Sequence, residues 1–324
     1  AGFIGVKPLV IFGADYARGA PLLTDFQAAV ASGKIQYLPS TRLWWLGADG
    51  EYAHDGPKGS DSGHAKRVIL ATGAQERPMP VPGWTLPGVM GVGAAQLLMK
   101  SGGALPEGDT AIVGTGPLPL LLAEQLARAG RPVAAMIEPA GGSALFGAAA
   151  LAPKALAAPK TALKGVALLA KRAMRRVAVW RNVQEIEIEG DTHVTGLRFR
   201  SRKAVHLPVR NVLLHDGIVP NLNPMRAAGL EMSYSDQQKT WHAQGNDRIQ
   251  LAGDGAGILG VDAAIVSGRV AARKLCGVPA AQRDLLTLGR LQAFRVFLDR
   301  AYPPVRTALT AKPDTILCRC EAIQ

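Results

Sequence analysis

A glycine-rich turn, Gly114-Thr115-Gly116-Pro117, follows the apolar run 111–113 and precedes the apolar segment 120–129. Glycines between a buried strand and a helix let the main chain approach a diphosphate, whose charge is met by the free amides at the helix N-terminus. Pro117 suits the first helical turn, where no backbone donor is needed. Gly114, Gly116 and Pro117 are therefore predicted to hold a dinucleotide, although Pro119 stands where a third glycine is usual.

An acid follows this turn at a spacing typical of sugar recognition. Glu138 ends the apolar run 133–138, about 20 residues after the turn. A carboxylate there can accept a hydrogen bond from a ribose 2′-hydroxyl and would repel a 2′-phosphate, which favours NAD over NADP. The alternative is a dinucleotide fold that no longer binds well.

A second acid lies between two glycines. Asp254 stands between Gly253 and Gly255, after the apolar run 249–252 and ahead of the apolar segment 261–275. In a flavin site this arrangement lets the carboxylate bind ribityl hydroxyls while the helix N-terminus faces the phosphates. The alternative is an ordinary helix N-cap aspartate.

The elements that must position these residues alternate between strands and helices. Strands at 111–113 and 133–138, with a helix at 120–129 between them, form a βαβ unit, which implies a parallel sheet. The other predicted elements are buried strands at 67–73, 211–217 and 249–252, strands at 35–38 and 41–46, a loop at 55–63, helices within 143–173 broken near Pro153 and Pro159, an antiparallel hairpin within 183–200, a helix at 261–275 with Cys276 as a core residue at its end, and an amphipathic helix at 283–300.

These motifs occur in an order that resembles flavoprotein oxidoreductases with two dinucleotide-binding domains. The run Pro82-Gly83-Trp84-Thr85-Leu86-Pro87-Gly88-Val89 is similar to the FAD subunits of amino-acid and opine dehydrogenase complexes, whose relatives include hydrogen cyanide synthase and heteromeric sarcosine oxidase. The resemblance covers most of the chain from about Tyr16 onward. The stretches that carry it, besides 82–89, are 70–74, Arg77-Pro78, 114–117, 213–221 and 253–255.

The resemblance implies an α/β fold of two nested, Rossmann-like dinucleotide-binding domains, with a β-hairpin insertion and a C-terminal helical tail. It places the FAD domain at 1–101 and 232–277, the NAD-type domain at 102–231, and a helical extension with the start of an iron–sulfur domain at 278–324. FAD would be held by Thr72, Gly73, Gly253, Asp254 and Gly255. Arg77, in an exposed loop, either meets the FAD phosphates or caps a carbonyl.

The function that the resemblance implies is that of an FAD-dependent oxidoreductase subunit. Electrons from an amino acid, opine or similar CH–NH donor, oxidised in a partner flavoprotein subunit, would pass through FAD, with NAD as a second cofactor. No catalytic base is assigned to this chain. Two alternatives stay open: a non-catalytic scaffold subunit, and a stand-alone NAD(P)H-dependent flavoprotein reductase. A redox Cys-x-x-Cys pair, as in disulfide reductases, does not occur in the sequence.

Two departures from the family pattern concern the cofactors. The family opens with a Gly-x-Gly-x-x-Gly turn for the FAD diphosphate, and nothing like it precedes Lys34, so we expect a lowered FAD affinity. The family's [2Fe–2S] module begins with Cys-x-Cys-Glu, which Cys318, Cys320 and Glu321 match. Because such a cluster needs four ligands, the two thiols are expected to be free in a mobile tail here, and to be metal ligands only in a longer chain. The sequence is thus expected to be a fragment.

The composition limits the function classes. Lys and Arg number 37 against 25 Asp and Glu, a formal charge of +12, and 48% of the residues are hydrophobic, which excludes a wholly disordered chain. No apolar run approaches the ~18 residues of a membrane span. Three cysteines and no signal peptide indicate a reducing, cytoplasmic compartment. The basic segment 139–184 contains no acid; nucleic acid, an anionic membrane or an acidic protein could bind it, but without a nucleic-acid motif a solvated helix face is favoured.

Overall fold

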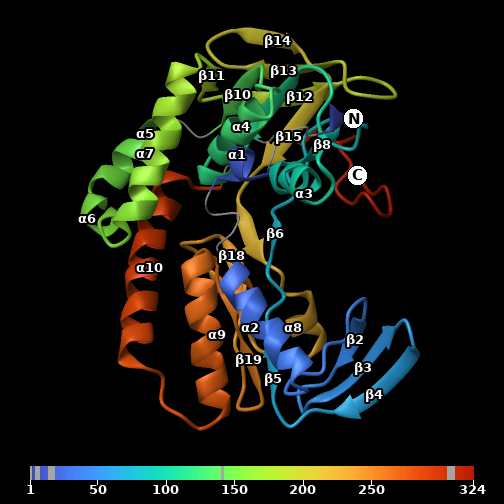
Figure 1. Ribbon diagram of the computed structural model, residues 1–324. Coiled ribbons are helices and arrows are strands. Elements are labelled where there is room, and N and C mark those ends of the chain that lie inside the picture. The colour runs from blue at the N-terminus through green and yellow to red at the C-terminus, as the bar shows by residue number, and fades with distance from the viewer. Residues whose placement is uncertain (1, 4–7, 14–18, 140–141, 305–310) are drawn as a thin grey trace. The chain divides into compact units, whose positions relative to one another are not determined.

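The computed structural model describes residues 2–3, 8–13, 19–139, 142–304 and 311–324. The chain divides into two compact units, and Figure 1 labels many of their elements. Unit 1 comprises Ala1–Gly13, Glu76–Gly217 and Ala293–Gln324, and unit 2 comprises Ala14–Gln75 and Ile218–Gln292. Both contain parallel strands and helices, which confirms the predicted α/β class.

Unit 1 is built on a five-stranded parallel sheet with the strand order β11-β10-β9-β15-β7. The predicted βαβ unit is confirmed, since the central strand β9 is followed by α4 and then by the parallel strand β10. All five residues of β9 are buried. The strands are β7 (Val89–Gly91), β9 (Thr110–Gly114), β10 (Ala135–Glu138), β11 (Ala178–Arg181) and β15 (Asn211–His215).

Helices cover one face of this sheet. Ile112, Met136 and Leu213, at corresponding positions of three adjacent strands, pack against residues of α1, α3, α4 and α7. The breaks predicted near Pro153 and Pro159 are confirmed, since α6 begins at the residue before Pro153 and α7 begins at Pro159 itself. No helix among the described residues is both long and apolar enough to cross a membrane. The helices with residues in unit 1 are α1 (Pro8–Phe12), α3 (Val92–Gly102), α4 (Pro117–Arg128), α5 (Gly142–Ala149), α6 (Ala152–Ala155), α7 (Pro159–Met174) and the second part of α10 (Gln282–Ala301).

A small antiparallel sheet covers the other face. Ile137 and Val113, which alternate with the helix-facing residues, share a core with Ile188 and Phe199 of this sheet. The predicted hairpin is confirmed as β12 (Gln184–Glu189) and β13 (Gly196–Arg200), and a third strand that was not predicted, β14 (Ala204–Pro208), pairs with β13. A short antiparallel pair, β1 (Gly2–Phe3) and β8 (Ala104–Leu105), also belongs to unit 1.

Unit 2 contains the parallel pair β5 and β19, which lies beside α9 and carries the turns at 71–73 and 252–255. Ile249, Leu70 and Met225 belong to its core. Helix α9 has the bounds predicted from the sequence. The elements with residues in unit 2 are α2 (Ala20–Ala31), β2 (Arg42–Leu46), β3 (Glu51–Gly56), β4 (Gly59–His64), β5 (Val68–Leu70), β16 (Ile218–Pro220, paired with β6, Ala74–Glu76), α8 (Asn223–Ala227), β17 (Met232–Ser235), β18 (Thr240–Ala243), β19 (Ile249–Leu251), α9 (Val261–Leu275) and the first part of α10.

Four local predictions are wrong. Residues 35–38 form no strand, because no described strand lies beside them to pair with; Tyr37 instead packs edge-on against Phe26. The loop predicted at 55–63 contains β4, whose polar residues pair with β3 while both faces stay largely exposed. Cys276 is exposed rather than part of the core. Helix α10 forms but has no single apolar face, since Leu285 and Leu286 are both exposed.

The chain passes from one compact unit to the other at positions that differ from the predicted domain boundaries at 101 and 231. Strand β7 joins the sheet of unit 1 by pairing with β15, so residues from Glu76 onward belong with that sheet. The chain returns to unit 2 after Gly217, and both Leu222 and Met225 are buried in the core of that unit. Which nucleotide belongs to which unit stays a prediction.

The basic segment 139–184 finds acidic partners elsewhere in unit 1. Glu124 of α4 accepts hydrogen bonds from the Nε atoms of Arg128 and Arg175, each at 2.8 Å, and lies 3.6 Å from Lys171 Nζ. Burial alone would raise the pKa of Glu124, but the hydrogen bonds from Arg175 and Arg128 outweigh burial and hold this pKa below its usual value. Part of the segment therefore folds against acids that it does not itself contain.

We expect Glu124→Gln to lower the free energy of unfolding at pH 7 by about 1 kcal/mol, because the cations lose their charged partner. The loss is no larger because these partly exposed cations are hydrated by water when their partner is neutral. Because the pKa is lower in the folded chain, the carboxylate stabilises the fold above its unfolded pKa, and this effect is lost as the pH falls through the folded pKa. Urea unfolding at pH 7 and at pH 3 measures the difference. An equal difference between wild type and variant at both pH values would contradict this interpretation.

Candidate functional site

The turn after β19 places Asp254 in unit 2. Gly253 adopts a φ of +64°, and its N–H donates to Ser267 Oγ of α9 at 2.8 Å, so the turn is fixed to that helix. The carbonyl of Asp254 accepts a hydrogen bond from the Gly257 N–H at 3.3 Å. The N-cap position of α9 is Gly260, so the alternative that made Asp254 a helix N-cap is wrong.

Thr72 and Gly73 lie at the same place in unit 2. Thr72 Oγ1 donates to the carbonyl of Asn221 at 2.9 Å, and the Asn221 N–H donates to the carbonyl of Gly73 at 3.1 Å. A Cβ at position 255 would lie 2.9 Å from Thr72 Oγ1 and 3.2 Å from Met225 Cε. The structure thus brings Thr72 and Gly255 into contact and adds Asn221, which belongs to the stretch that carried the family resemblance but was given no site role.

Two side-chain oxygens at this site are buried without a hydrogen-bond partner among the described residues, Asp254 Oδ1 and Asn221 Oδ1. A buried acceptor without a donor costs about 1–3 kcal/mol, so a native structure that contains one requires an explanation. A ligand with several hydroxyl groups, such as the ribityl chain of FAD, would supply the missing donors. The residues present therefore fit FAD.

The turn Gly114-Thr115-Gly116 lies in unit 1, between β9 and α4. Gly114 has a φ of +143°, and a Cβ there would lie 2.1 Å from the carbonyl oxygen of His215 on the neighbouring strand. Gly116 has a φ of +123°, but a Cβ there would meet nothing within 4 Å. Gly116 is also the N-cap of α4, and no side chain caps the helix there. Because Pro117 and Pro119 have no N–H, Leu118 is the one residue among the first three of α4 whose amide can face an anion, so the first turn offers a diphosphate fewer donors than such a site usually has.

These two glycines give a matched pair of variants. We expect Gly114→Ala to lower the free energy of unfolding by more than about 2 kcal/mol, because backbone must move to admit the methyl group. Gly116→Ala should lower the free energy of unfolding by only about 1 kcal/mol, through the strain of a positive φ. Its main effect should be weaker nucleotide binding. Denaturant unfolding and calorimetric titration with NAD⁺ measure the two effects. Equal destabilisation by both substitutions would contradict the close approach at Gly114.

Glu138 does not stand free at the end of β10. Its Oε1 accepts a short hydrogen bond from Arg172 of α7, and its Oε2 accepts one from Arg181 Nε of β11 at 3.1 Å. Sequence reasoning missed these partners, which lie 34 and 43 residues away along the chain. Two guanidinium groups offset the negative charge on which the preference for NAD over NADP depended.

Arg77 caps a carbonyl. Its Nε donates to the carbonyl of Asp216 at 3.2 Å and lies 3.8 Å from the carboxylate of the same residue, while its N–H donates to the carbonyl of Gly217 at 3.0 Å. The side chain is 14% exposed, so its prediction as an exposed-loop residue is wrong. Of the two roles considered, the structure shows the contact with a carbonyl.

A hydrogen-bonded pair at the carboxyl end of β15, in which His215 is buried and Glu76 is half-buried, was not found by sequence reasoning. His215 Nδ1 lies 2.7 Å from Glu76 Oε1, and Glu76 Oε2 accepts a hydrogen bond from the Gly93 N–H at 2.8 Å, in the first turn of α3. A Cβ at position 91 would lie 2.1 Å from Glu76 Oε2. Glu76 thus joins β15 to the N-terminus of α3.

The C-terminal segment 311–324, which contains Cys318 and Cys320, packs against other residues of unit 1. Trp84 Nε1 donates to the carbonyl of Ile316, the guanidinium of Arg319 lies 5.5 Å from the centre of the Trp84 ring, and Lys312 Nζ pairs with Glu187 at 2.8 Å. The described residues 311–324 therefore do not form the mobile tail that was expected. Both Cys318 and Cys320 are free thiols, and no group of three metal-ligating side chains occurs in the described ranges. Their role as cluster ligands stays a prediction.

Comparison with known proteins gives clear relatives. An opine oxidase subunit of Agrobacterium tumefaciens (strain Ach5) is 37% identical over 340 residues, which cover 96% of this chain and 66% of that protein. Hydrogen cyanide synthase subunit HcnB of Pseudomonas aeruginosa is 33% identical over 349 residues, which cover 98% of this chain and 73% of HcnB. The chain spans 66% and 63% of the length of the first two opine oxidase subunits that it matches. No family model matches it.

Solved structures show the same fold at low identity. L-proline dehydrogenase from P. horikoshii matches with a TM-score of 0.53 and 17% identity, over 92% of this chain and 51% of that one. Thioredoxin reductase from T. acidophilum matches with a TM-score of 0.53 and 16% identity, over 79% of this chain and 80% of that one. These likenesses confirm the predicted two-domain flavoprotein fold. On sequence identity over nearly its whole length, the chain belongs to the family that contains these opine oxidase and hydrogen cyanide synthase subunits.

Proposed function

We propose that this chain is an FAD-dependent oxidoreductase subunit that passes on electrons from the oxidation of an amine, with an amino acid or opine as the substrate class. The family membership supports the reaction class, since the relatives are named as opine oxidase and hydrogen cyanide synthase subunits. The observation that carries the proposal is the buried, unpartnered Asp254 Oδ1 between two glycines at the end of a parallel strand. An acceptor in that position fits the hydroxyl groups of a flavin side chain.

The residues of unit 2 would bind and orient the cofactor. Asp254 accepts hydrogen bonds from ribityl hydroxyls, and Gly255 allows close packing against Thr72. Thr72 is itself held by its hydrogen bond to Asn221. The N-terminus of α9 directs its partial positive charge toward an anionic cofactor. FAD, when bound, supplies the chemistry of accepting and releasing electrons.

The remaining parts of the assignment concern unit 1 and the complex. Gly114, Gly116 and Pro117 would hold the diphosphate of NAD, with Glu138 near its ribose. Cys318 and Cys320 would be [2Fe–2S] ligands in a longer chain. The proposed partner is a substrate-oxidising flavoprotein subunit, in keeping with relatives that are named as subunits.

Anaerobic reduction of FAD bound to the protein tests the proposal. We expect the flavin absorbance to bleach when an amine substrate is added together with the partner subunit, but not with NADH alone. Bleaching by NADH without the partner would favour a stand-alone reductase. A protein that binds FAD but is reduced under neither condition would contradict the electron-transfer role.

A further inference from the structure

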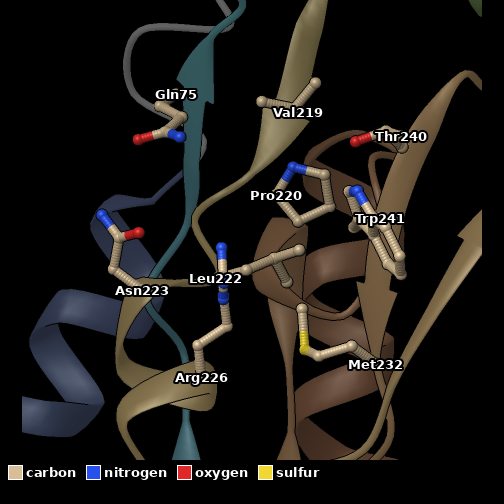
Figure 2. A pocket seen from close by; sticks show the side chains of 9 residues that line it. All are labelled: Gln75, Val219, Pro220, Leu222, Asn223, Arg226, Met232, Thr240 and Trp241. Carbon is tan, nitrogen blue, oxygen red and sulfur yellow. The ribbon is translucent and has the colours of Figure 1, made fainter.

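A pocket of about 590 Å³ lies within unit 2, and none of its lining residues belongs to the proposed FAD site. Its volume falls in the range of small-molecule sites, roughly 300–1,000 Å³. Pro220, Leu222, Met232 and Trp241 give it an extended apolar wall, seen to the right of centre in Figure 2. A ligand that fills it must therefore carry an apolar body.

The apolar wall is held by two elements. Trp241 of β18 packs edge-on against Tyr234 of the paired strand β17, with ring centres 5.4 Å apart, so its indole is braced from one side. Trp241 is nevertheless 52% exposed, which leaves ring surface for a ligand. A braced, half-exposed tryptophan loses little conformational freedom when a planar apolar group packs on it.

Polar groups line the opposite side of the pocket. Figure 2 shows the amides of Gln75 and Asn223 there, with the Arg226 side chain rising from α8 between them and the apolar wall. Arg226 is the only charged residue that lines the pocket, and its guanidinium has no hydrogen-bond or ion-pair partner in the described part of the chain. A guanidinium remains charged at any physiological pH, and its planar fork matches a carboxylate.

We propose that this pocket binds a small organic carboxylate with an apolar or aromatic body. The carboxylate pairs with Arg226 and accepts hydrogen bonds from the amides of Asn223 and Gln75, while the body packs on Trp241 and Met232. A single cation among apolar side chains suits a monoanion better than a phosphate dianion, which would need more positive charge around it.

The site is separate from FAD binding, although both involve helix α8. Met225, which precedes Arg226, faces the other way and lies 3.7 Å from Thr72 Oγ1. The inference therefore does not rest on the proposed function. Loss of FAD binding would leave the pocket unaffected, and loss of the pocket ligand would leave the FAD site intact.

Calorimetric titration of the 324-residue chain with 3-phenylpropionate, and with its uncharged amide as a matched probe, tests the proposal. We expect the carboxylate to bind at least about tenfold more tightly than the amide, as a charge-assisted hydrogen bond implies. Arg226→Gln should reduce the affinity for the carboxylate to that for the amide and leave the amide unaffected. Trp241→Ala should weaken both probes together, because it removes the shared apolar contact.

Arg290→Gln is the control, because Arg290 is an exposed arginine of the same unit that does not line the pocket. It should leave both affinities unchanged, and Arg226→Gln and Arg290→Gln should both unfold at the wild-type temperature, since both side chains are exposed. Equal affinity for the two probes, no binding of either, or an equal loss in Arg226→Gln and Arg290→Gln would each overturn the proposal.

Discussion

Asp254→Ala is expected to weaken FAD binding about ten- to hundredfold, because it removes a charged acceptor for ribityl hydroxyls. The same substitution should leave the ligand-free chain as stable as wild type, or more stable by about 1 kcal/mol, since Oδ1 is buried there without a donor. The opposite signs of the two effects are the characteristic of a binding residue. Substitution of a residue whose role is structural would lower both the stability of the chain and its affinity for FAD.

Fluorescence titration with FAD and urea unfolding of the ligand-free chain measure these two quantities. Asp25→Ala serves as the control, because Asp25 is an exposed acid of the same unit on α2. It should change neither the affinity nor the stability. If Asp254→Ala destabilised the ligand-free chain by more than about 1 kcal/mol, its carboxylate would be structural and the assignment to FAD would be wrong.

Glu76→Ala is expected to have the largest effect on stability, a loss of about 3 kcal/mol. It leaves both His215 Nδ1 and the Gly93 N–H without an acceptor in a site where the His215 side chain is only 4% exposed. Both donors belong to unit 1, so we expect the loss in that unit. Chemical denaturation followed by the fluorescence of Trp84 and Trp180, which pack against its core, reports it.

Glu76→Gln provides the matched control. The amide oxygen can still accept a hydrogen bond from Gly93, so the expected loss is about 1 kcal/mol. Similar losses for alanine and glutamine would mean that the charge, rather than the hydrogen bonds, stabilises this site. A loss below about 1 kcal/mol for alanine would show that water replaces the carboxylate at little cost.

The parts of the fold set by local sequence were predictable. The turn at Gly114 and the apolar runs on either side of it identified β9, α4 and β10, because glycine placement and apolar periodicity act over a few residues. The same holds for α9. Residues 35–38 show the limit of such reasoning, since a strand needs a neighbour, and an apolar run alone does not supply one.

The surroundings of the site residues could not be predicted. The partners of Glu138 lie 34 and 43 residues away, and Glu76 and His215 are 139 residues apart. These contacts arise from the order of strands in the sheet, and a local sequence pattern does not determine that order. Sequence reasoning found the candidate ligands Gly253, Asp254 and Gly255, but the contact between Thr72 and Asn221 came from the structure.

A spectral titration of the chain with FAD tests whether unit 2 binds the flavin through Asp254. We expect one FAD bound per chain, with a structured visible band and quenched flavin fluorescence, and a matching titration of Asp254→Ala that is shifted to at least about tenfold higher FAD concentration. The spectrum of free FAD at every protein concentration, or the same affinity for wild type and Asp254→Ala, would contradict it.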